Sequence, residues 1–359
     1  MKFKKLITLG LLVTLGAVFS ACGSNNATKD ADTKPTGITA SPTDDNKEAL
    51  PAVVNIGVIA GGPESAILVE QKFLEELGVK ANIVQYSAGT DINNAIVSGD
   101  VDIACFGSSP IALGIANGIG YKAVFVSYLE GGNIEALVVK NGMKAKKVED
   151  LKGKTIAAPF GTTSHYALLN TLKLAGLSQS DVKVLDMGGQ DIAAAWTRGD
   201  IDGAFIWSPA LDECLKNDGS ILTNVTDLAK QGVTIPEIAV ARTEFAKKYP
   251  SVVTAYVKAL IKVYHLVDTD PNQATKNVAT WEEISEENAK GQVKDNIWVS
   301  EKDQISTDYL GTTESIGKIA DTLKTIADFH VEQGNLATAP DLSKFQAAID
   351  PSFVEEALK

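Results

Sequence analysis

The sequence predicts an α/β protein with two lobes, each a mostly parallel sheet flanked by helices. Strand-like and helix-like segments alternate along residues 53–242, which is typical of parallel sheets with covered faces. A segment of the first half recurs 100 residues later, which indicates that one structural unit occurs once in each lobe. The folded part, residues 51–359, is also too long for one typical hydrophobic core.

The recurring segments are GTDINNAIVSGDVDIA at residues 89–104 and GQDIAAAWTRGDIDGA at residues 189–204. They are identical at eight of sixteen positions, and each leads into a Ser-Pro pair, at residues 109–110 and 208–209. Each copy predicts a helix that ends at a glycine, then a strand, then a new helix whose first backbone amides are free. The shared positions include aspartates without an evident structural role, so we favour duplication or convergence of the lobes over coincidence.

The first 21 residues have the features of an export signal peptide. Lysines within residues 1–5 precede the apolar run of residues 6–19, which is shorter than the ~20 residues that a membrane-spanning helix needs. Small residues then lead to Cys22, an arrangement that resembles a bacterial lipobox. We therefore predict a lipoprotein anchored through Cys22, with an ordinary signal peptide as the alternative.

Residues 22–50 are predicted to be a flexible tether between the lipid anchor and the folded body. They contain almost no large apolar residues, so they cannot bury enough surface to offset the entropy of ordering. The whole chain carries a formal net charge of −12, which argues against a nucleic-acid partner because such partners need basic patches. An anion bound by this chain must therefore be captured by local hydrogen-bond donors.

The predicted elements follow one another in a regular order after residue 52. Strands are predicted at residues 53–59, 81–86, 101–106, 121–127, 134–140, 155–159, 182–187, 203–207, 221–224 and 235–242. Helices are predicted at residues 64–77, 144–152, 164–175 and 249–268, and nearly all of the chain after residue 243 reads as helical.

The order of the elements suggests how the chain is divided between the lobes. The first lobe is expected to comprise residues 51–137 and 241–359, with C-terminal helices packed back on it, and the second lobe residues 138–240. The strands at residues 134–140 and 235–242 would then cross between the lobes and form the hinge.

Three predicted strands end in polar residues, and ligands of open α/β sheets bind at the carboxyl ends of strands. These ends are Gly-Ser-Ser-Pro at residues 107–110, Phe-Gly-Thr-Thr-Ser-His at residues 160–165 and Trp-Ser-Pro at residues 207–209. Hydroxyls and free helix-start amides suit a permanently ionised oxyanion without a full countercharge. Plain helix capping is the alternative for each motif taken singly.

Other residues near the strand ends are candidates for the rest of such a site. Trp207 could pack flat against a short alkyl chain or a cation, or it could pack in the core of its lobe. Acidic residues near strand ends could hold a ligand ammonium, and they are Glu64, Glu130, Glu135 and Asp212.

The sequence gives little support to catalysis. It lacks a nucleophile elbow, a P-loop and a dinucleotide fingerprint, and its histidines lack metal-ligand spacing. We therefore expect no catalytic residue, no metal and no cofactor. Cys105 and Cys214 fall in opposite predicted lobes, so we expect two buried thiols rather than a disulfide.

Four segments together resemble the solute-binding proteins of bacterial ABC importers of the nitrate/sulfonate/taurine type, and most closely their taurine-binding branch. They are GSSP at residues 107–110, EALVVK at 135–140, APFGTTSHYALL at 158–169 and AAWTRGDIDGAFIWSPA at 194–210. The similarity spans most of residues 53–345. It implies the type II periplasmic-binding-protein fold, with a cleft that closes on its ligand by a hinge and delivers it to a membrane permease.

The resemblance also assigns the ligand contacts for the anionic end of a sulfonate. Ser108, Ser109 and the loop of Thr162 and Thr163 would hold the sulfonate group. His165, at the same strand end as the two threonines, is a further candidate for contact with the ligand.

The remaining contacts implied by the resemblance concern the chain and the amine of taurine. Trp207 would pack against the ethylene chain, and Glu135 would hold the ammonium. Residues 61–64 depart from the taurine-binding pattern, so Glu64 either contacts the ligand or only caps the first helix.

The resemblance implies a monomeric lipoprotein, held by palmitate on the extracytoplasmic face of the cell membrane. Its partners would be a small sulfonate, taurine first, and an ABC permease with a cytoplasmic ATPase, and it would touch the membrane only through its lipid. Alternative ligands are an alkanesulfonate, 2-aminoethylphosphonate, nitrate and a thiamine-precursor pyrimidine. An enzyme on the same fold and a surface sensor or adhesin are the other classes of function left open.

Overall fold

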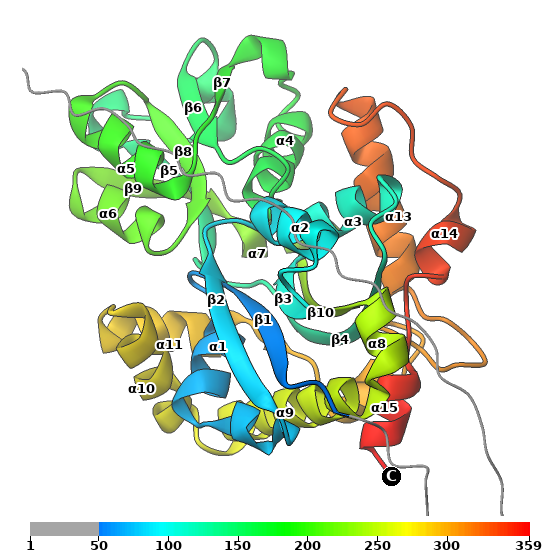
Figure 1. The fold of residues 1–359 in the computed structure, drawn as a ribbon. Coiled ribbons are helices and arrows are strands. Elements are labelled where there is room, and N and C mark those ends of the chain that lie inside the picture. Colours follow the sequence, from blue (N-terminus) through cyan, green and yellow to red (C-terminus); the bar gives the residue numbers. More distant parts are fainter. Residues whose placement is uncertain (1–49) are drawn as a thin grey trace, which may run out of the picture. The chain divides into compact units, whose positions relative to one another are not determined.

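The computed structural model describes residues 50–359, which carry two β-sheets with flanking helices (Figure 1). The predicted signal peptide, Cys22 and all but the last residue of the predicted tether lie outside the described residues. Within residues 50–359, no helix combines the length and the apolar character needed to cross a membrane. We call each sheet with its own helices a lobe.

The first lobe is built on the sheet with the strand order β11-β4-β10-β3-β1-β2. Its strands are β1 (Val53–Ile59), β2 (Lys80–Tyr86), β3 (Ile103–Gly107), β4 (Tyr121–Leu129), β10 (Pro236–Arg242) and β11 (Ile297–Trp298). β1 pairs parallel with β2 and β3, whereas β10 pairs antiparallel with β3 and β4, and β11 antiparallel with β4.

The second lobe is built on the sheet with the strand order β7-β6-β8-β5-β9. Its strands are β5 (Glu135–Lys140), β6 (Thr155–Ala158), β7 (Lys183–Asp186), β8 (Gly203–Trp207) and β9 (Gly219–Asn224). β6 pairs parallel with β7 and β8, whereas β5 pairs antiparallel with β8 and β9.

The sheets are therefore mixed, which corrects the expectation of mostly parallel sheets. The strands that the chain enters directly after crossing between lobes, β5 and β10, run against their neighbours. When the chain enters a lobe from the other lobe, its first strand starts at the end of the sheet that faces the other lobe. That strand therefore runs away from the other lobe. Accordingly, Glu135 at the start of β5 lies opposite Trp207 at the end of β8, and Glu237 near the start of β10 lies opposite Gly107 and Tyr128.

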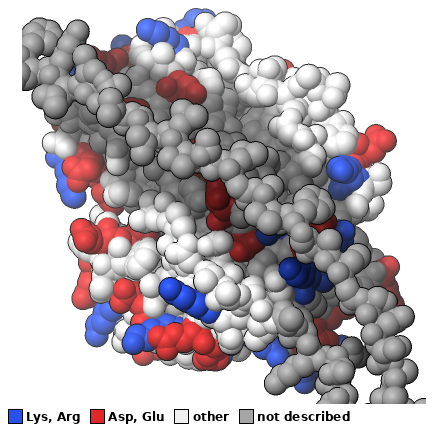
Figure 2. All heavy atoms as spheres, viewed as in Figure 1, with Lys and Arg blue, Asp and Glu red and all other residues white. Residues whose placement is uncertain are grey.

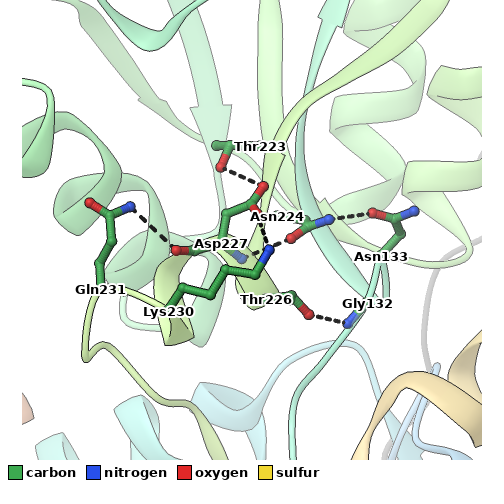
Figure 3. Close-up of polar contacts among 8 residues, drawn as sticks. All are labelled: Gly132, Asn133, Thr223, Asn224, Thr226, Asp227, Lys230 and Gln231. Carbon is green, nitrogen blue, oxygen red and sulfur yellow. Dashed lines mark hydrogen bonds and ion pairs between the residues drawn. The ribbon is translucent and has the colours of Figure 1, made fainter.

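The chain passes between the sheets in the connection before β5 and again in the connection before β10. β5 lies wholly in the second sheet and β10 wholly in the first, which corrects the expectation that these strands themselves cross between the lobes. Figure 3 shows how the first connection is fixed to α7 (Val225–Ala229). The amide of Gly132 donates to Thr226 Oγ1 at 2.6 Å, and Asn224 Nδ2 donates to Asn133 Oδ1 at 2.7 Å. The crossing segment is thus anchored to the second lobe.

Both copies of the repeated segment form the predicted helix, glycine and strand. α2 (Gly89–Ser98) ends at Gly99 and leads to β3, and α5 (Gly189–Arg198) ends at Gly199 and leads to β8. The two glycines have φ of 84° and 81°, a left-handed conformation that glycine adopts without steric cost.

The aspartates that end the repeat have a structural role, which corrects our expectation. Asp102 Oδ2 accepts the amide hydrogen of Asn55 in β1 at 3.0 Å, and Asp202 Oδ2 accepts that of Thr155 in β6 at 2.9 Å. Each aspartate thereby ties the loop before one strand to the neighbouring parallel strand. The aspartate thus has the same structural role in both copies of the repeat.

The helices outside the repeat cover the faces of both sheets (Figure 1). In the second lobe, α4 and α6 contact β8 and β5, whereas in the first lobe α9 and α15 pack on β4, α10 against α1, and α13 against α3. Their bounds are α1 (Pro63–Glu70), α3 (Ser108–Ala116), α4 (Thr163–Leu174), α6 (Ala210–Lys216), α8 (Thr243–Lys248), α9 (Pro250–Thr269), α10 (Pro271–Glu282), α11 (Glu286–Asp295), α12 (Glu301–Gln304), α13 (Ile319–Glu332), α14 (Leu342–Gln346) and α15 (Ser352–Ala357).

Two predicted helices are interrupted in the structure. The helix expected at residues 64–77 ends at Glu70 and continues as a separate 3₁₀ helix, Phe73–Leu77, because Lys72 has a left-handed φ of 57°. Residues 144–152 contain the 3₁₀ helix Val148–Leu151 instead of an α-helix, and Lys144 is again left-handed. A left-handed residue breaks the hydrogen-bond ladder of an α-helix.

Both faces of the second sheet are buried, as its alternating side chains require. Ala136 and Val138 of β5 belong to a cluster around the fully buried Trp196, whereas Leu137 and Val139 join the larger core that runs through the first lobe. The described cysteines, Cys105 on β3 and Cys214 on α6, are free and buried, which confirms the expectation of two thiols.

Candidate ligand-binding site

A cavity lies where strand ends and helix starts of both lobes meet. Figure 2 shows acidic side chains recessed near the centre of the face drawn there, among otherwise mixed surface charges. The cavity is lined by Ile59, Gly61, Gly62, Gly89, Gly107, Pro110, Tyr128, Glu130 and Glu237 on the first-lobe side, and by Ile134, Glu135, Thr162, Thr163 and Trp207 on the second-lobe side. Among these described residues there is no lysine or arginine.

The helices α1 to α4 all begin at this cavity. Gly62 precedes α1, Gly89 starts α2, Gly107 precedes α3, and Thr162 precedes α4. The first amides of a helix lack partners within it, and the helix dipole adds partial positive charge there. Because α3 belongs to the first lobe and α4 to the second, an anion in the cavity could receive hydrogen bonds from both lobes.

The two predicted threonines line the cavity, but their hydroxyls are already engaged. Thr162 Oγ1 donates to the carbonyl of Pro159 at 2.6 Å, and Thr163 Oγ1 donates to Glu135 Oε1 at 2.9 Å. Their contribution to anion binding therefore rests on the backbone amides at the start of α4.

The two predicted serines are buried and do not line the cavity, whereas their neighbours Gly107 and Pro110 do. Ser109 Oγ is hydrogen-bonded to His330 Nε2 at 2.9 Å, and it also donates weakly to the carbonyl of Gly161 at 3.5 Å. Ser108 Oγ is buried and has no partner among the described residues. Of the four predicted hydroxyls, that of Ser108 is the one left free.

His165 also lies outside the lining. Its ring stacks on that of Phe160 with centroids 4.1 Å apart, and its Nδ1 accepts the amide hydrogen of Gly161 at 3.4 Å. Burial lowers the pKa of His165 to about 4, so the ring is neutral at physiological pH. We find His165 placed to fix the loop before α4 rather than to touch a ligand in the cavity.

Glu135 is the predicted ammonium partner, and the structure places it in the cavity wall. It is the first residue of β5, it is 1% exposed, and it accepts hydrogen bonds from Thr163 Oγ1 at 2.9 Å and Ser164 Oγ at 2.5 Å. Burial raises the pKa of Glu135, and the two hydroxyls oppose that rise because they stabilise the ionised form.

Glu130 and Glu237 bring two further carboxyl groups to the same cavity. Burial raises the pKa of Glu130 well above its usual range, and the charges of Glu135 and Glu237 raise it further. Burial likewise raises the pKa of Glu237, with a smaller contribution from the charge of Glu64. The cavity is therefore a place where a cation would relieve the crowding of carboxylates.

Glu64 is buried directly behind the cavity wall and does not line it. Its Oε1 accepts from Ser65 Oγ at 2.7 Å, and a Cβ placed on Gly62 would lie 3.1 Å from that Oε1. Burial raises the pKa of Glu64. Asp212, another acid noted near a strand end, accepts from Asn288 Nδ2 at 2.8 Å and is also absent from the lining.

Trp207 joins the lobes at one side of the cavity. It is the last residue of β8, and its Nε1 donates to the carbonyl of Ala60 in the first lobe at 3.1 Å. The adjacent Gly61 has a φ of 91°, and a Cβ there would lie 2.4 Å from the carbonyl oxygen of Ser208. The loop before α1 therefore touches the end of β8 backbone to backbone.

Glu237 is the acidic residue of the cavity that sequence reasoning missed, and Tyr128 was not named as a candidate either. The rule that ligands bind at the carboxyl ends of strands does not point to the start of β10. The signal that could have found Glu237 is its place as the second residue of β10, a strand that the chain enters from the other lobe. The start of such a strand lies beside the carboxyl end of its neighbour β3, where Gly107 lines the cavity.

Comparison with known proteins identifies relatives of this chain. A family model described as NMT1/THI5 like matches residues 67–274. The taurine-binding periplasmic protein of Escherichia coli is 34% identical over 290 residues, which cover 79% of this chain and 87% of that protein.

Solved structures confirm the predicted fold class. The alkanesulfonate-binding protein SsuA from Xanthomonas axonopodis pv. citri superposes with a TM-score of 0.69 at 21% identity, covering 84% of this chain and 99% of that chain. The desulfurization enzyme DSZB shares the fold at a TM-score of 0.62 and 14% identity, over 86% of this chain and 99% of that chain. At these sequence identities the solved structures show the fold alone. The matching family model and the taurine-binding relative show that the chain belongs to the NMT1/THI5-like family.

Proposed function

We propose that this chain is the extracytoplasmic solute-binding component of an ABC importer, with taurine (2-aminoethanesulfonate) as its ligand. The observation that carries the proposal is the cavity between the lobes, which combines helix starts from both lobes with the buried carboxylate of Glu135. The similarity to a taurine-binding protein supports the choice of ligand. The chain captures and releases its ligand unchanged, as a monomer that hands it to a permease.

Taurine fits the chemistry of this cavity because it is a short zwitterion. The amides at the starts of α3 and α4 would bind the sulfonate, Glu135 would bind the ammonium, and Trp207 would cover the two-carbon chain between them. A buried charge without a partner costs several kcal/mol, so a site built for both ends rejects ligands that lack one of them.

Titration calorimetry of the purified protein with taurine, ethanesulfonate, 2-aminoethylphosphonate and nitrate tests the proposal. We expect taurine to bind most tightly, because ethanesulfonate and nitrate leave Glu135 without a cation and the phosphonate brings extra negative charge toward the carboxyls. Recovery of each compound unchanged is expected. Chemical turnover of any of them, or nitrate as the preferred ligand, would contradict the proposal.

Acidic pH is expected to weaken taurine binding and to strengthen ethanesulfonate binding. Burial raises the pKa of Glu135, and that of Glu130 and Glu237 still more, so on acidification these carboxyls take up protons at a higher pH than exposed glutamates do. Protonation removes the attraction for an ammonium and also the repulsion of a simple anion.

Calorimetry of both ligands at a series of pH values from neutral to acidic checks the prediction. Glu282, whose pKa burial raises to about 8, accepts the Gly61 amide and also takes up a proton on acidification. It does not line the cavity, so we expect it to affect both ligands alike. The ratio of the two affinities therefore reports the carboxyls in the cavity. Parallel pH profiles for taurine and ethanesulfonate would show that these carboxyls do not face the ligand amine.

We further propose that the mature chain is a lipoprotein anchored by palmitate on Cys22. Replacing Cys22 with serine is expected to move the protein from the membrane fraction to the soluble extracytoplasmic fraction, because the acyl chains supply its membrane affinity. Fractionation and metabolic labelling with radioactive palmitate measure this. Equal membrane retention of the Cys22→Ser variant would rule out the anchor.

A further inference from the structure

A second groove borders the ligand cavity at Trp207. Trp207 is the one described residue that lines both spaces. Apart from Ser87, Gln190 and Glu213, the groove is lined by apolar side chains and a glycine, namely Ala60, Gly189, Ala193, Ile206, Trp207, Pro209 and Ala210. Trp207 therefore borders both a cavity with polar groups and a largely apolar groove.

The indole of Trp207 is held in place by contacts with the first lobe. Trp207 Nε1 donates to the carbonyl of Ala60 at 3.1 Å, and a Cβ on Gly61 would lie 3.1 Å from Trp207 Cδ1. The backbone beneath Trp207 is fixed by its pairing with Glu135 in the β5–β8 ladder. These contacts hold the indole, which borders both spaces, in one orientation.

We propose that Trp207 sets the upper limit of ligand length by separating the cavity for a two-carbon aminosulfonate from a groove that would take a longer or N-substituted one. The inference rests on the proposed function, and it names Trp207 as the residue that makes the protein selective for short ligands. Without the indole, the cavity and the groove become one space, whose new part is apolar and matches an alkyl or cycloalkyl extension.

The separation depends on closure of the lobes. Trp207 belongs to the second lobe and the Ala60 carbonyl to the first, so their hydrogen bond exists only when the lobes meet. A ligand tail that passed the indole would have to break this bond and to hold the lobes apart. Selection against long ligands therefore occurs at closure, which is the step that determines affinity in a hinged binding protein.

The test compares taurine with N-cyclohexyl-2-aminoethanesulfonate, which carries the same two ends and a bulky apolar substituent. Calorimetry of the purified protein should give binding of taurine and not of the cyclohexyl compound. In Trp207→Ala, taurine should weaken at least about tenfold, the scale of one lost aromatic contact, while the cyclohexyl compound gains at least about tenfold. Trp207→Phe keeps a ring at this position and should retain the original order of the two ligands.

A second substitution tests whether Trp207→Ala joins the cavity to the groove or only makes the whole site less ordered. Ala193 lies in the groove and not in the cavity, so Ala193→Phe added to Trp207→Ala should abolish the gain for the cyclohexyl compound and leave the residual taurine affinity unchanged. Circular dichroism checks that each variant is folded, and Trp207→Leu replaces Trp207→Ala if that variant does not fold.

The outcomes distinguish this inference from the proposed function. Tight taurine binding by the unmodified protein, combined with equal losses for both ligands in Trp207→Ala, would overturn the length limit and leave the proposed function standing. A gain for the cyclohexyl compound that persists in the double variant would also overturn it. Absence of taurine binding by the unmodified protein would overturn both.

Discussion

Replacing Gly61 with alanine is expected to lower taurine affinity by about 10- to 100-fold, the scale of an overpacked contact of 1–3 kcal/mol. The new Cβ would lie 2.4 Å from the carbonyl oxygen of Ser208, which is closer than real Cβ contacts come, and this oxygen is a backbone atom that cannot rotate away. Because Gly61 is in the first lobe and Ser208 in the second, the clash arises where the lobes meet. The lobes can relieve it by staying apart, so the penalty falls on ligand binding.

Gly78 offers a matched control for this prediction. It has a left-handed φ of 73°, similar to the 91° of Gly61, but nothing lies within 4 Å of a Cβ built on it. Gly78→Ala therefore introduces the same kind of backbone strain without the clash, and it should bind taurine normally. Titration calorimetry gives both affinities, and equal affinities for the two variants would mean that the contact between Gly61 and Ser208 is not part of the bound state.

Glu135→Gln is expected to weaken taurine binding on the order of 100-fold, because a buried ligand ammonium loses its countercharge. The amide keeps the shape of the side chain, and its oxygen can still accept the hydrogen bonds of Thr163 and Ser164. Ethanesulfonate lacks the ammonium, so its affinity should stay the same or rise. Equal losses for both ligands would place the ammonium elsewhere.

Glu64→Gln serves as the control for Glu135→Gln. Both carboxyls are 1% exposed and both accept a serine hydroxyl, but only Glu135 lines the cavity. The control should change taurine affinity much less than Glu135→Gln does. A larger loss in Glu64→Gln would make Glu64 the ammonium partner and would move the site toward α1.

Much of the fold could be predicted because local patterns determined it. β1 and β8 have the predicted bounds, and the two glycines that end α2 and α5 follow directly from the repeat. The direction of β5 and β10 could not be predicted, since it depends on the lobe from which the chain arrives. The left-handed Lys72 has no sequence signal either, because lysine rarely adopts that conformation.

The candidate site was predictable in part for the same reason. Thr162, Thr163 and Trp207 end strands or start helices, and the structure brings them into one cavity with Glu135. The hydrogen bond of Ser109 with His330 joins residues that are 221 positions apart, and only the packing of α13 on α3 reveals it. Such distant partners decide which hydroxyls remain free, so the roles of Ser108 and Ser109 needed the structure.

A crystal structure of the protein with taurine tests the central claim most directly, since that claim concerns which groups touch the sulfonate. The account predicts sulfonate oxygens within hydrogen-bond distance of backbone amides at the start of α3 in the first lobe and of α4 in the second, with the amine at Glu135. A sulfonate that contacts the helix starts of one lobe alone, or that lies outside the cavity, would contradict the account.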